Sequence, residues 1–351
     1  MIRTIVVDDS ALIRQMLSEM LNEAPDIEVV DTAHDPYDAR EKIKQHNPDV
    51  ITLDVEMPKM DGITFLRNIM RLRPMPVIMV SSLTQEGADV TLEALEVGAV
   101  DYVPKPQTNL ASEFHNYAGE IQEKVRMAAS ANVRRRVSPK TPPEKKGVDA
   151  VLPRRKPGDL QSTEKLIAIG ASTGGTEAIR QVLEQLPPDS PAVVVAQHIP
   201  QAFSGAFASR MDGGCALTVC EAQHGQRIIP GHVYVAPGDR HLTIKRDGAR
   251  YTCHLNDGEP VNRHRPSVDV LFRSVAEQAG RNAVAALLTG MGDDGAQGMK
   301  ELHDLGVTTV AQDEGTSVVW GMPGTAVELG ATDHVLPLDA IATALLNASR
   351  R

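Results

Sequence analysis

The chain has 351 residues, 42% of them hydrophobic, and a formal net charge of −10. A single hydrophobic core rarely organises a chain of this length, so two domains are expected. The sequence has no apolar run long enough to span a membrane, and its first residues, MIRTIVVDDS, lack the pattern of a secretory signal. We therefore expect a soluble, cytoplasmic protein with no direct membrane insertion.

The charge divides the chain into three segments. Residues 1–125 carry a net charge of −11, residues 126–160 a net charge of +7, and residues 161–351 a net charge of −6. The middle segment has five prolines between Pro139 and Pro157, dense basic charge and little apolar periodicity. This composition is typical of a flexible linker, although a docking role for a basic segment stays open. We predict one domain on each side of it.

The three cysteines, Cys215, Cys220 and Cys253, are odd in number and match no C-x-x-C spacing. They indicate reduced thiols rather than a disulfide framework or a zinc site.

Short apolar runs alternate with segments of helical spacing in residues 1–125. This alternation predicts a parallel sheet with helices on both faces, in which functional groups gather beyond the carboxyl ends of the strands. Asp8 and Asp9 follow the first expected strand, and Asp54 ends the third. Three converging carboxylates would repel one another unless a hard cation lies between them, so we predict a Mg²⁺ site.

Two further side chains follow later strands of the same sheet. Ser81 ends the fourth expected strand, and Lys105 follows the fifth. A hydroxyl and a lysine beside a metal-bound carboxylate suit a phosphoryl group, because all three neutralise or hydrogen-bond its oxygens. Taken singly, each residue could be an ordinary turn or surface residue. Together they make Asp54 a candidate phosphoryl acceptor.

The motifs VVDDS, LDVEMPKMDG, MVSS and YVPKP fall in order at successive strand ends. In this respect residues 1–125 resemble the receiver domain of bacterial two-component response regulators, which has a flavodoxin-like fold. The resemblance implies that a histidine kinase phosphorylates Asp54. It also implies that Asp8 and Asp9 help to bind Mg²⁺ together with the backbone carbonyl of Glu56.

The same resemblance assigns three further roles in the receiver. Lys105 would contact the phosphoryl group, and Ser81 and Tyr102 would form the switch pair that responds to phosphorylation. The peptide bond between Lys105 and Pro106 would be cis. None of these assignments says what the switch controls.

Residues 161–351 repeat the alternation of apolar strands and helical segments. The runs KLIAIGAS, PAVVVAQH, NAVAALLTG and GVTTVAQ are candidates for buried strands, and GTEAIRQVLEQL has helical spacing. The more irregular residues 231–255 suggest hairpin strands at one edge. We therefore predict a second doubly wound α/β domain, mostly parallel, with an antiparallel edge hairpin.

Ser172 lies in the stretch GASTGG, directly after the first of these strands. The stretch satisfies G-x-S-x-G, in which small neighbours allow a serine to sit on a tight turn between strand and helix. A serine in this place could equally be the N-cap of the following helix. A dinucleotide-binding loop is disfavoured, because the G-x-G-x-x-G spacing is absent and the next strand ends in Gln197 and His198 rather than in an acidic residue.

A nucleophilic serine needs a base, and the base needs an orienting acid. His198 follows the next expected strand, and Asp293 and Asp294 follow a later one. All these groups map to the same edge of one parallel sheet, where they can converge. The chain order Ser, His, Asp differs from the Ser, Asp, His order of α/β-hydrolases, so that fold is disfavoured.

The motifs GASTGGTEAIR, AQHIP, LLTGMGDDGAQGM and VVWGMPGTA, which follow a receiver and a proline-rich linker, resemble those of the chemotaxis protein-glutamate methylesterases, which are also protein-glutamine glutaminases. The resemblance implies Ser172 as nucleophile, His198 as general base and then acid, and Asp294 as the residue that orients the imidazole. Asp293 remains an alternative to Asp294 from the residues alone.

Two supporting roles also follow from the resemblance. Thr173 would support the histidine, and Met291 would supply an oxyanion-hole N–H. The esterase chemistry would need no cofactor, the substrates would be methyl-accepting chemoreceptors, and a receiver packed over the esterase face would be loosened by phosphorylation. A DNA-binding output is disfavoured, because residues 161–351 are acidic and show no helix-turn-helix pattern, so no nucleic-acid partner is expected. A scaffolding output would leave the three reactive residues unexplained.

Overall fold

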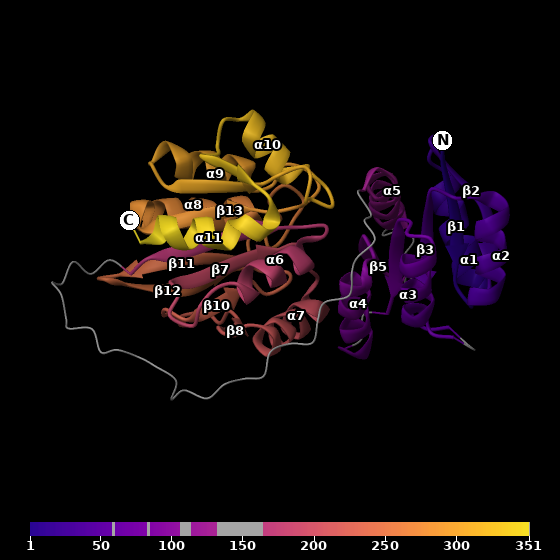
Figure 1. Cartoon of the computed structure of the whole chain (residues 1–351), viewed down its shortest axis with the longest axis horizontal. Coiled ribbons are helices and arrows are strands. Elements are labelled where there is room, and N and C mark those ends of the chain that lie inside the picture. Colours follow the sequence, from indigo (N-terminus) through magenta and orange to yellow (C-terminus); the bar gives the residue numbers. More distant parts are fainter. Residues whose placement is uncertain (58–59, 83–84, 106–113, 132–163, 351) are drawn as a thin grey trace.

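The computed structural model of the chain describes residues 1–57, 60–82, 85–105, 114–131 and 164–350. Two parallel sheets organise these residues. Figure 1 shows them as two bodies side by side, with the N-terminus on the first and the C-terminus on the second.

The first sheet has five parallel strands in the order β2-β1-β3-β4-β5. This is the strand order of flavodoxin-like folds, as predicted. The strands are β1 (Ile2–Val7), β2 (Ile27–Ala33), β3 (Val50–Asp54), β4 (Val77–Ser81) and β5 (Asp101–Pro104). The helices are α1 (Ala11–Asn22), α2 (Pro36–His46), α3 (Gly62–Leu72), α4 (Gln85–Val97) and α5 (Phe114–Ser130).

The central strands of this sheet have no polar face. β3 reads VITLD and β4 reads VIMVS, and every residue of both is buried. Continuous apolar runs are typical of parallel strands that helices cover on both sides. Helix α5 continues to Ser130, past residue 125, the end of the first domain expected from the sequence.

The second sheet has seven parallel strands in the order β15-β14-β13-β6-β7-β10-β8. The strands are β6 (Leu166–Ala171), β7 (Ala192–Gln197), β8 (Thr218–Glu221), β10 (His232–Val235), β13 (Ala283–Leu287), β14 (Thr308–Gln312) and β15 (His334–Leu336). The helices are α6 (Gly175–Glu184), α7 (Gln201–Gly214), α8 (Val268–Gln278), α9 (Ala296–Asp304), α10 (Met322–Glu328) and α11 (Leu338–Ser349), with a short 3₁₀ turn at Gly280–Asn282.

Helices cover both faces of the second sheet. Side chains alternate along a strand, so Ile167 and Ile169 of β6 lie in one apolar cluster with α6, α7 and α11. Leu166 and Ala168 of the same strand lie in another cluster, with α8, α9 and α10. The predicted doubly wound α/β fold is confirmed.

The predicted antiparallel hairpin is confirmed as β11 (His241–Asp247) and β12 (Arg250–Asn256). It does not extend the edge of the parallel sheet. Instead it forms a separate three-stranded sheet with β9 (Arg227–Ile228) and contacts α8. The physical reason is its apolar face, since Leu242, Ile244, Tyr251 and Cys253 are buried in the cluster that contains α8. None of the helices in the described ranges has the length and apolarity of a membrane span.

Candidate active site

The carboxyl ends of three neighbouring strands carry the three predicted triad residues. Ser172 directly follows β6, His198 directly follows β7, and Asp294 lies in the loop after β13. Because β6 lies between β13 and β7 in the sheet, these residues meet at one edge of it. The juxtaposition expected from the positions of the strand ends is therefore present.

The Ser172 hydroxyl is directed at an imidazole, not at a helix. Its Oγ lies 3.1 Å from Nδ1 of His198. Helix α6 begins at Gly175 after Gly174, and no side-chain hydrogen bond caps it. Gly174 adopts a φ of +73°, and a Cβ there would meet Val318 at 2.6 Å, so the turn has no room for a larger residue. The alternative of Ser172 as a helix cap is excluded.

Asp294 is the carboxylate in contact with the histidine. Its Oδ2 lies 2.8 Å from His198 Nε2, and the residue is 1% exposed. Burial alone would raise its pKa, but hydrogen bonds outweigh burial and lower the pKa to about 2. The donors are His198, the side chains of Asn262 and Ser267, and the backbone N–H groups of Val268 and Asp269.

The neighbouring Asp293 has a different environment. It is exposed, and its backbone carbonyl accepts a hydrogen bond from Ala296 at the start of α9. The geometry therefore distinguishes the two carboxylates that the sequence left open, and only Asp294 bonds the imidazole.

A loop between β12 and α8, which no sequence motif had indicated, also contributes to the site. Asn262 donates to Asp294 Oδ1 at 2.8 Å. The ring of His264 stacks on the ring of His198, with 3.7 Å between centroids and 11° between planes. This loop lies about thirty residues before Asp294 in the chain and has no periodic signal, so only the tertiary structure brings it to the site.

Of the two predicted supporting residues, Thr173 does not contact the histidine as expected, whereas nothing in the structure conflicts with the role predicted for Met291. The Thr173 hydroxyl donates to Asp101 of β5, at 2.7 Å, rather than to His198. Met291 follows Gly290, where an added Cβ would lie 2.8 Å from the Cβ of Ser172. The described part of the chain provides no acceptor for the Met291 backbone N–H, which leaves this donor available beside the serine.

The predicted acidic cluster is present at the carboxyl edge of the first sheet. Asp8, Asp9 and Asp54 each offer an oxygen within 4.8 Å of the others. Lys105 Nζ lies 2.8 Å from Asp54 Oδ2 and 4.0 Å from Asp8 Oδ2. The Asp8 oxygen is buried and has no hydrogen-bond partner among the described residues. An unsatisfied buried carboxylate oxygen fits a site for a divalent cation, since carboxylates are the ligands that Mg²⁺ prefers.

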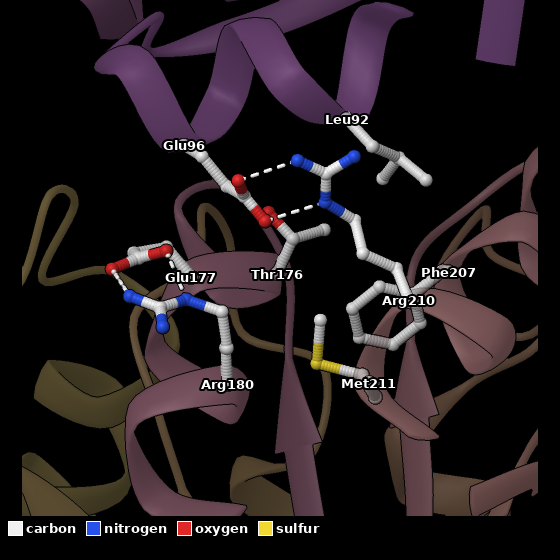
Figure 2. Close-up of a pocket in the computed structure, with 8 residues that line it drawn as sticks. All are labelled: Leu92, Glu96, Thr176, Glu177, Arg180, Phe207, Arg210 and Met211. Atoms are coloured by element: carbon white, nitrogen blue, oxygen red, sulfur yellow. Dashed lines mark hydrogen bonds and ion pairs between the residues drawn. The ribbon is translucent and has the colours of Figure 1, made fainter. Parts of the chain in front are cut away.

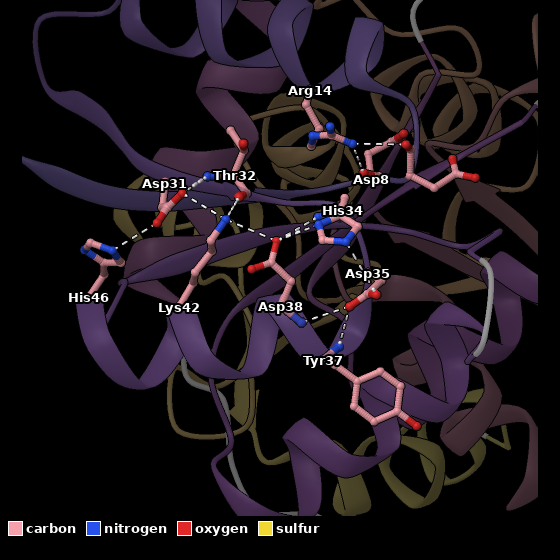
Figure 3. A network of polar contacts seen from close by, with 11 residues as sticks. Asp8, Arg14, Asp31, Thr32, His34, Asp35, Tyr37, Asp38, Lys42 and His46 are labelled. Carbon is pink, nitrogen blue, oxygen red and sulfur yellow. Dashed lines mark hydrogen bonds and ion pairs between the residues drawn. The ribbon is translucent and has the colours of Figure 1, made fainter.

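Burial raises the pKa of Asp54 to about 6, the charge of Asp8 adds to this shift, and Lys105 opposes it. Burial also raises the pKa of Asp8. Arg14 holds the backbone of this pocket, because it donates to the carbonyls of Asp8 at 2.8 Å and Asp9 at 3.0 Å (Figure 3). A raised carboxylate pKa indicates a site that favours a nearby positive charge.

Figure 3 also shows the surface network that joins α2 to β2 in the first domain. Lys42 lies 3.3 Å from Asp31 and 3.1 Å from Asp38, and His46 lies 3.1 Å from Asp31. Asp35 caps α2 by accepting from the backbone N–H groups of its first turn. These contacts fix the second strand and helix and do not reach Asp54.

The predicted switch residues occupy defined positions. The Ser81 hydroxyl is buried and contacts the Gly87 carbonyl of α4 at 3.3 Å. Tyr102 is buried and stacks on Phe203 of α7, with centroids 4.9 Å apart. The Glu56 backbone N–H donates to Asp54 Oδ1 at 3.1 Å. The predicted cis bond before Pro106 lies outside the described residues.

Two family models match the chain, the CheB methylesterase model at residues 167–345 and the response regulator receiver model at residues 4–113. The protein-glutamate methylesterase/protein-glutamine glutaminase of Hydrogenovibrio crunogenus is 54% identical over 98% of both chains. A relative of the same name from Xanthomonas euvesicatoria is 56% identical over 99% of this chain and 97% of its own. The chain belongs to the CheB methylesterase family.

A solved structure agrees with this assignment. The crystal structure of the Thermotoga maritima CheB methylesterase catalytic domain covers 53% of this chain and 98% of its own, with 38% identity and a TM-score of 0.52. The second sheet therefore has the fold of a methylesterase domain, and the first sheet lies within the residues that the receiver model matches.

Strand β5 of the receiver contacts the methylesterase domain beside the catalytic edge. Asp101 accepts the Thr173 hydroxyl, and Tyr102 stacks on Phe203. Lys124 of α5 fixes this strand, with Nζ 3.2 Å from Asp101 Oδ1 and 2.5 Å from the Tyr102 carbonyl. One short strand thus carries two contacts to the other domain and ends at Pro104, directly before Lys105.

Helices α4 and α7 form a second part of the interface. Arg210 of α7 makes a bidentate ion pair with Glu96 of α4, with both bonds at 2.5 Å. Figure 2 shows this pair above a small pocket that α4, α6 and α7 line, with Leu92, Phe207 and Met211 on its apolar side. The interface therefore combines apolar packing with a charged pair.

A third group of contacts comes from the loops around the serine. Met291, Val318 and Val319 pack against an apolar cluster whose buried members are all receiver residues. Val318 is also the residue that a side chain at position 174 would meet. The receiver therefore rests on the loops that frame Ser172.

Proposed function

We propose that this protein is a phosphorylation-activated serine hydrolase. It removes methyl groups from glutamyl methyl esters of methyl-accepting chemoreceptors, and it converts receptor glutamines to glutamates, during chemotactic adaptation. The hydrogen-bonded series Ser172, His198 and Asp294 carries this proposal, together with the names of the close relatives. It combines a nucleophile, a base and an orienting acid.

The first half-reaction forms an acyl-enzyme. His198 Nδ1 accepts the proton of Ser172 as Oγ attacks the γ-carbonyl carbon of the methylated glutamyl side chain. The Met291 N–H stabilises the negative charge on the carbonyl oxygen. When the tetrahedral intermediate collapses, His198 returns the proton to the leaving methoxy group, and methanol departs.

Water completes the cycle. His198 takes a proton from a water molecule that attacks the acyl carbon, and it then protonates Ser172 Oγ as the ester bond breaks, so that glutamate and free serine remain. With a glutamine substrate the first leaving group is ammonia. Asp294 holds Nε2 of the imidazole throughout and stabilises its positive charge. This chemistry needs no cofactor.

In the receiver, Asp54 accepts a phosphoryl group from a chemotaxis histidine kinase. Asp8, Asp9 and Asp54 would hold Mg²⁺ together with the Glu56 backbone carbonyl, and the ion would neutralise charge on the phosphoryl oxygens. The cluster of carboxylates and the buried Asp8 oxygen, which has no hydrogen-bond partner among the described residues, support this assignment. Lys105 would bind a phosphoryl oxygen, and Ser81 and Tyr102 would respond to it.

Gating follows from the interface. The receiver in this structure packs against Thr173, Phe203 and Met291, so a receptor segment cannot occupy the same face. Phosphorylation would lower the affinity of the receiver for this face and open the site. The physical requirement is a difference in contact free energy between the two receiver states.

We place the receiver at residues 1–130, because α5 ends at Ser130 rather than at the residue 125 expected from the sequence, and the catalytic domain at residues 161–351, with the linker between them. We place the protein in the cytoplasm, where Cys215, Cys220 and Cys253 would remain the free thiols that the structure shows. No nucleic-acid partner is proposed.

The test measures release of radiolabelled methanol from methylated receptor membranes, with and without a small phosphodonor. The wild type should release methanol, and the phosphodonor should accelerate release. Ser172→Ala should be inactive, and Asp54→Asn should not respond to the phosphodonor. If Ser172→Ala released methanol at the wild-type rate, the serine mechanism would be wrong. If the phosphodonor accelerated methanol release by Asp54→Asn, Asp54 would not be the phosphoryl acceptor.

A further inference from the structure

The ring of His264 stacks on one face of the ring of His198, the general base of the proposed mechanism. The two nitrogens of His198 are engaged in the plane of the ring, Nδ1 by Ser172 and Nε2 by Asp294. These bonds leave the flat faces of the ring to be supported by packing. One face is covered by His264, whose ring is nearly parallel at 3.7 Å. The His198 side chain is only 8% exposed as a result of such packing.

A tight backbone turn at residues 261–264 positions the His264 ring. Val261 and His264 exchange two backbone hydrogen bonds, of 3.0 and 2.9 Å. The two residues between them, Asn262 and Arg263, have φ values of +52° and +68°. Two successive left-handed residues are the signature of a type I′ turn, and for arginine this conformation is uncommon. A non-glycine residue keeps such a conformation only where its surroundings enforce it, which happens most often at functional sites.

The same turn also reaches the acid of the triad. The Asn262 side-chain nitrogen lies 2.8 Å from Asp294 Oδ1 and 2.7 Å from Asp269 Oδ2. Two residues of one turn, separated by Arg263, therefore contact the triad: Asn262 bonds the carboxylate and His264 stacks on the imidazole. This arrangement explains why the strained conformation at Arg263 is retained.

The charge state of His264 suits a neighbour of an imidazolium. Burial is the largest cause that lowers its pKa to about 4; the charges of His198, Lys124 and Arg263 act in the same direction, and the charge of Asp294 opposes them. His264 is therefore neutral wherever the enzyme works near neutral pH. A neutral aromatic face attracts a cation stacked on it, whereas a charged ring would repel it.

We propose that His264 is a positioning residue of the esterase, whose stacked ring holds His198 in line between Ser172 and Asp294 and stabilises the positive charge that His198 acquires when the serine attacks. This inference rests on the proposed function. It adds a residue that acts through His198 and does not touch the substrate. An aromatic ring should therefore be sufficient at this position, and a titratable one should not be required.

The experiment compares His264→Ala, His264→Leu and His264→Phe in the full chain with phosphodonor present. We expect kcat for methanol release to fall on the order of tenfold in the alanine and leucine variants, the size of a desolvated cation–π contact, with KM within about twofold of wild type. The phenylalanine variant should recover most of kcat. The rate of Ser172 labelling by a fluorophosphonate probe should follow kcat in all three.

Leucine and phenylalanine fill the position similarly, so their difference isolates the aromatic face even if the alanine variant fails to fold. His232→Ala is the matched control, because His232 begins β10 at the opposite end of its strand from the catalytic edge. Equal kcat values in the leucine, phenylalanine and wild-type proteins would overturn the proposal, as would a loss expressed only in KM. If the wild type itself released no methanol, the proposed function would fail instead.

Discussion

Asp294 keeps its charge in a buried position because donors surround both of its oxygens. His198 donates to one oxygen, and Asn262 and Ser267 donate to the other. A carboxylate so fixed cannot rotate away from the imidazole, and so it determines which nitrogen faces the serine. The proposed activity therefore depends on the orientation of the His198 ring.

Replacing Asp294 by asparagine should therefore remove most of the activity. We expect Asp294→Asn to lower kcat by about 10³-fold to 10⁴-fold, because an amide in this place favours the wrong tautomer of His198. Asp293→Asn is the matched control and should stay within about twofold of wild type, since Asp293 is exposed and does not contact the histidine. Methanol release by the two variants measures this, and equal losses in both would contradict the assignment.

The low pKa of Asp294 also predicts a dependence of stability on pH. Its folded pKa, about 2, lies below its ordinary value of 3.8. Its contribution to the free energy of unfolding is therefore present above pH 3.8 and is lost as the pH falls through 2. The full contribution is about 2 kcal/mol, of which about 1 kcal/mol is lost between pH 5 and pH 3.

Urea unfolding at pH 5 and at pH 3 measures this effect. The wild type should lose about 1 kcal/mol more than Asp294→Asn over this interval, because the amide does not titrate. Comparing the two proteins cancels the other carboxylates, which titrate in both. The same loss in both proteins would show that the buried carboxylate is not held as the structure has it.

At the scale of elements, helices α4 and α7 join the two domains through one charged pair and an apolar pocket. The Arg210 and Glu96 side chains are each about one-third exposed, so the ion pair is only partly buried. An ion pair of this kind contributes roughly 0.5 to 1 kcal/mol. That is enough to change the fraction of molecules with an open catalytic face.

Arg210→Ala should therefore raise methanol release by the unphosphorylated enzyme about twofold to fivefold, while the rate with phosphodonor changes little. Arg273→Ala is the control, because Arg273 forms an ion pair with Glu301 between α8 and α9 within the methylesterase domain. The control should change neither rate. If both variants had the same basal rate as the wild type, the α4–α7 contact would not contribute to gating.

At the scale of the whole molecule, the structure predicts that the receiver inhibits by coverage. A chain of residues 161–351 should be more active than the unphosphorylated full chain, because it lacks the surface that covers Thr173 and Met291. The Thermotoga maritima catalytic domain, solved on its own, supports the folding of such a fragment. Equal activity of the fragment and the unphosphorylated full chain would rule out coverage as the mechanism.

The sequence predicted the two sheets and the triad for a physical reason. Parallel strands bring their carboxyl ends to one edge, so the juxtaposition of Ser172 and His198 could be expected from the ends of two predicted strands. Asp294 could be distinguished from Asp293 only from the structure, because the difference depends on the direction in which each side chain points from its loop. His264 and Asp101 required tertiary contacts that no periodicity encodes: the stack on His198 and the bond to Thr173.

Strand β5 has a consequence for the order of events on the receptor. Asp101 and Tyr102 bind the catalytic domain, and Lys105, a few residues on, binds Asp54. Coupling between two sites is reciprocal by thermodynamic necessity. Suppose that phosphorylation of Asp54 weakens the binding of β5 to the catalytic domain by some factor. A receptor segment that displaces β5 then shifts the phosphorylation equilibrium of Asp54 towards the phosphorylated form by the same factor. Under the proposed function, an enzyme docked on its substrate would then favour the phosphorylated state of Asp54 more strongly than a free enzyme does.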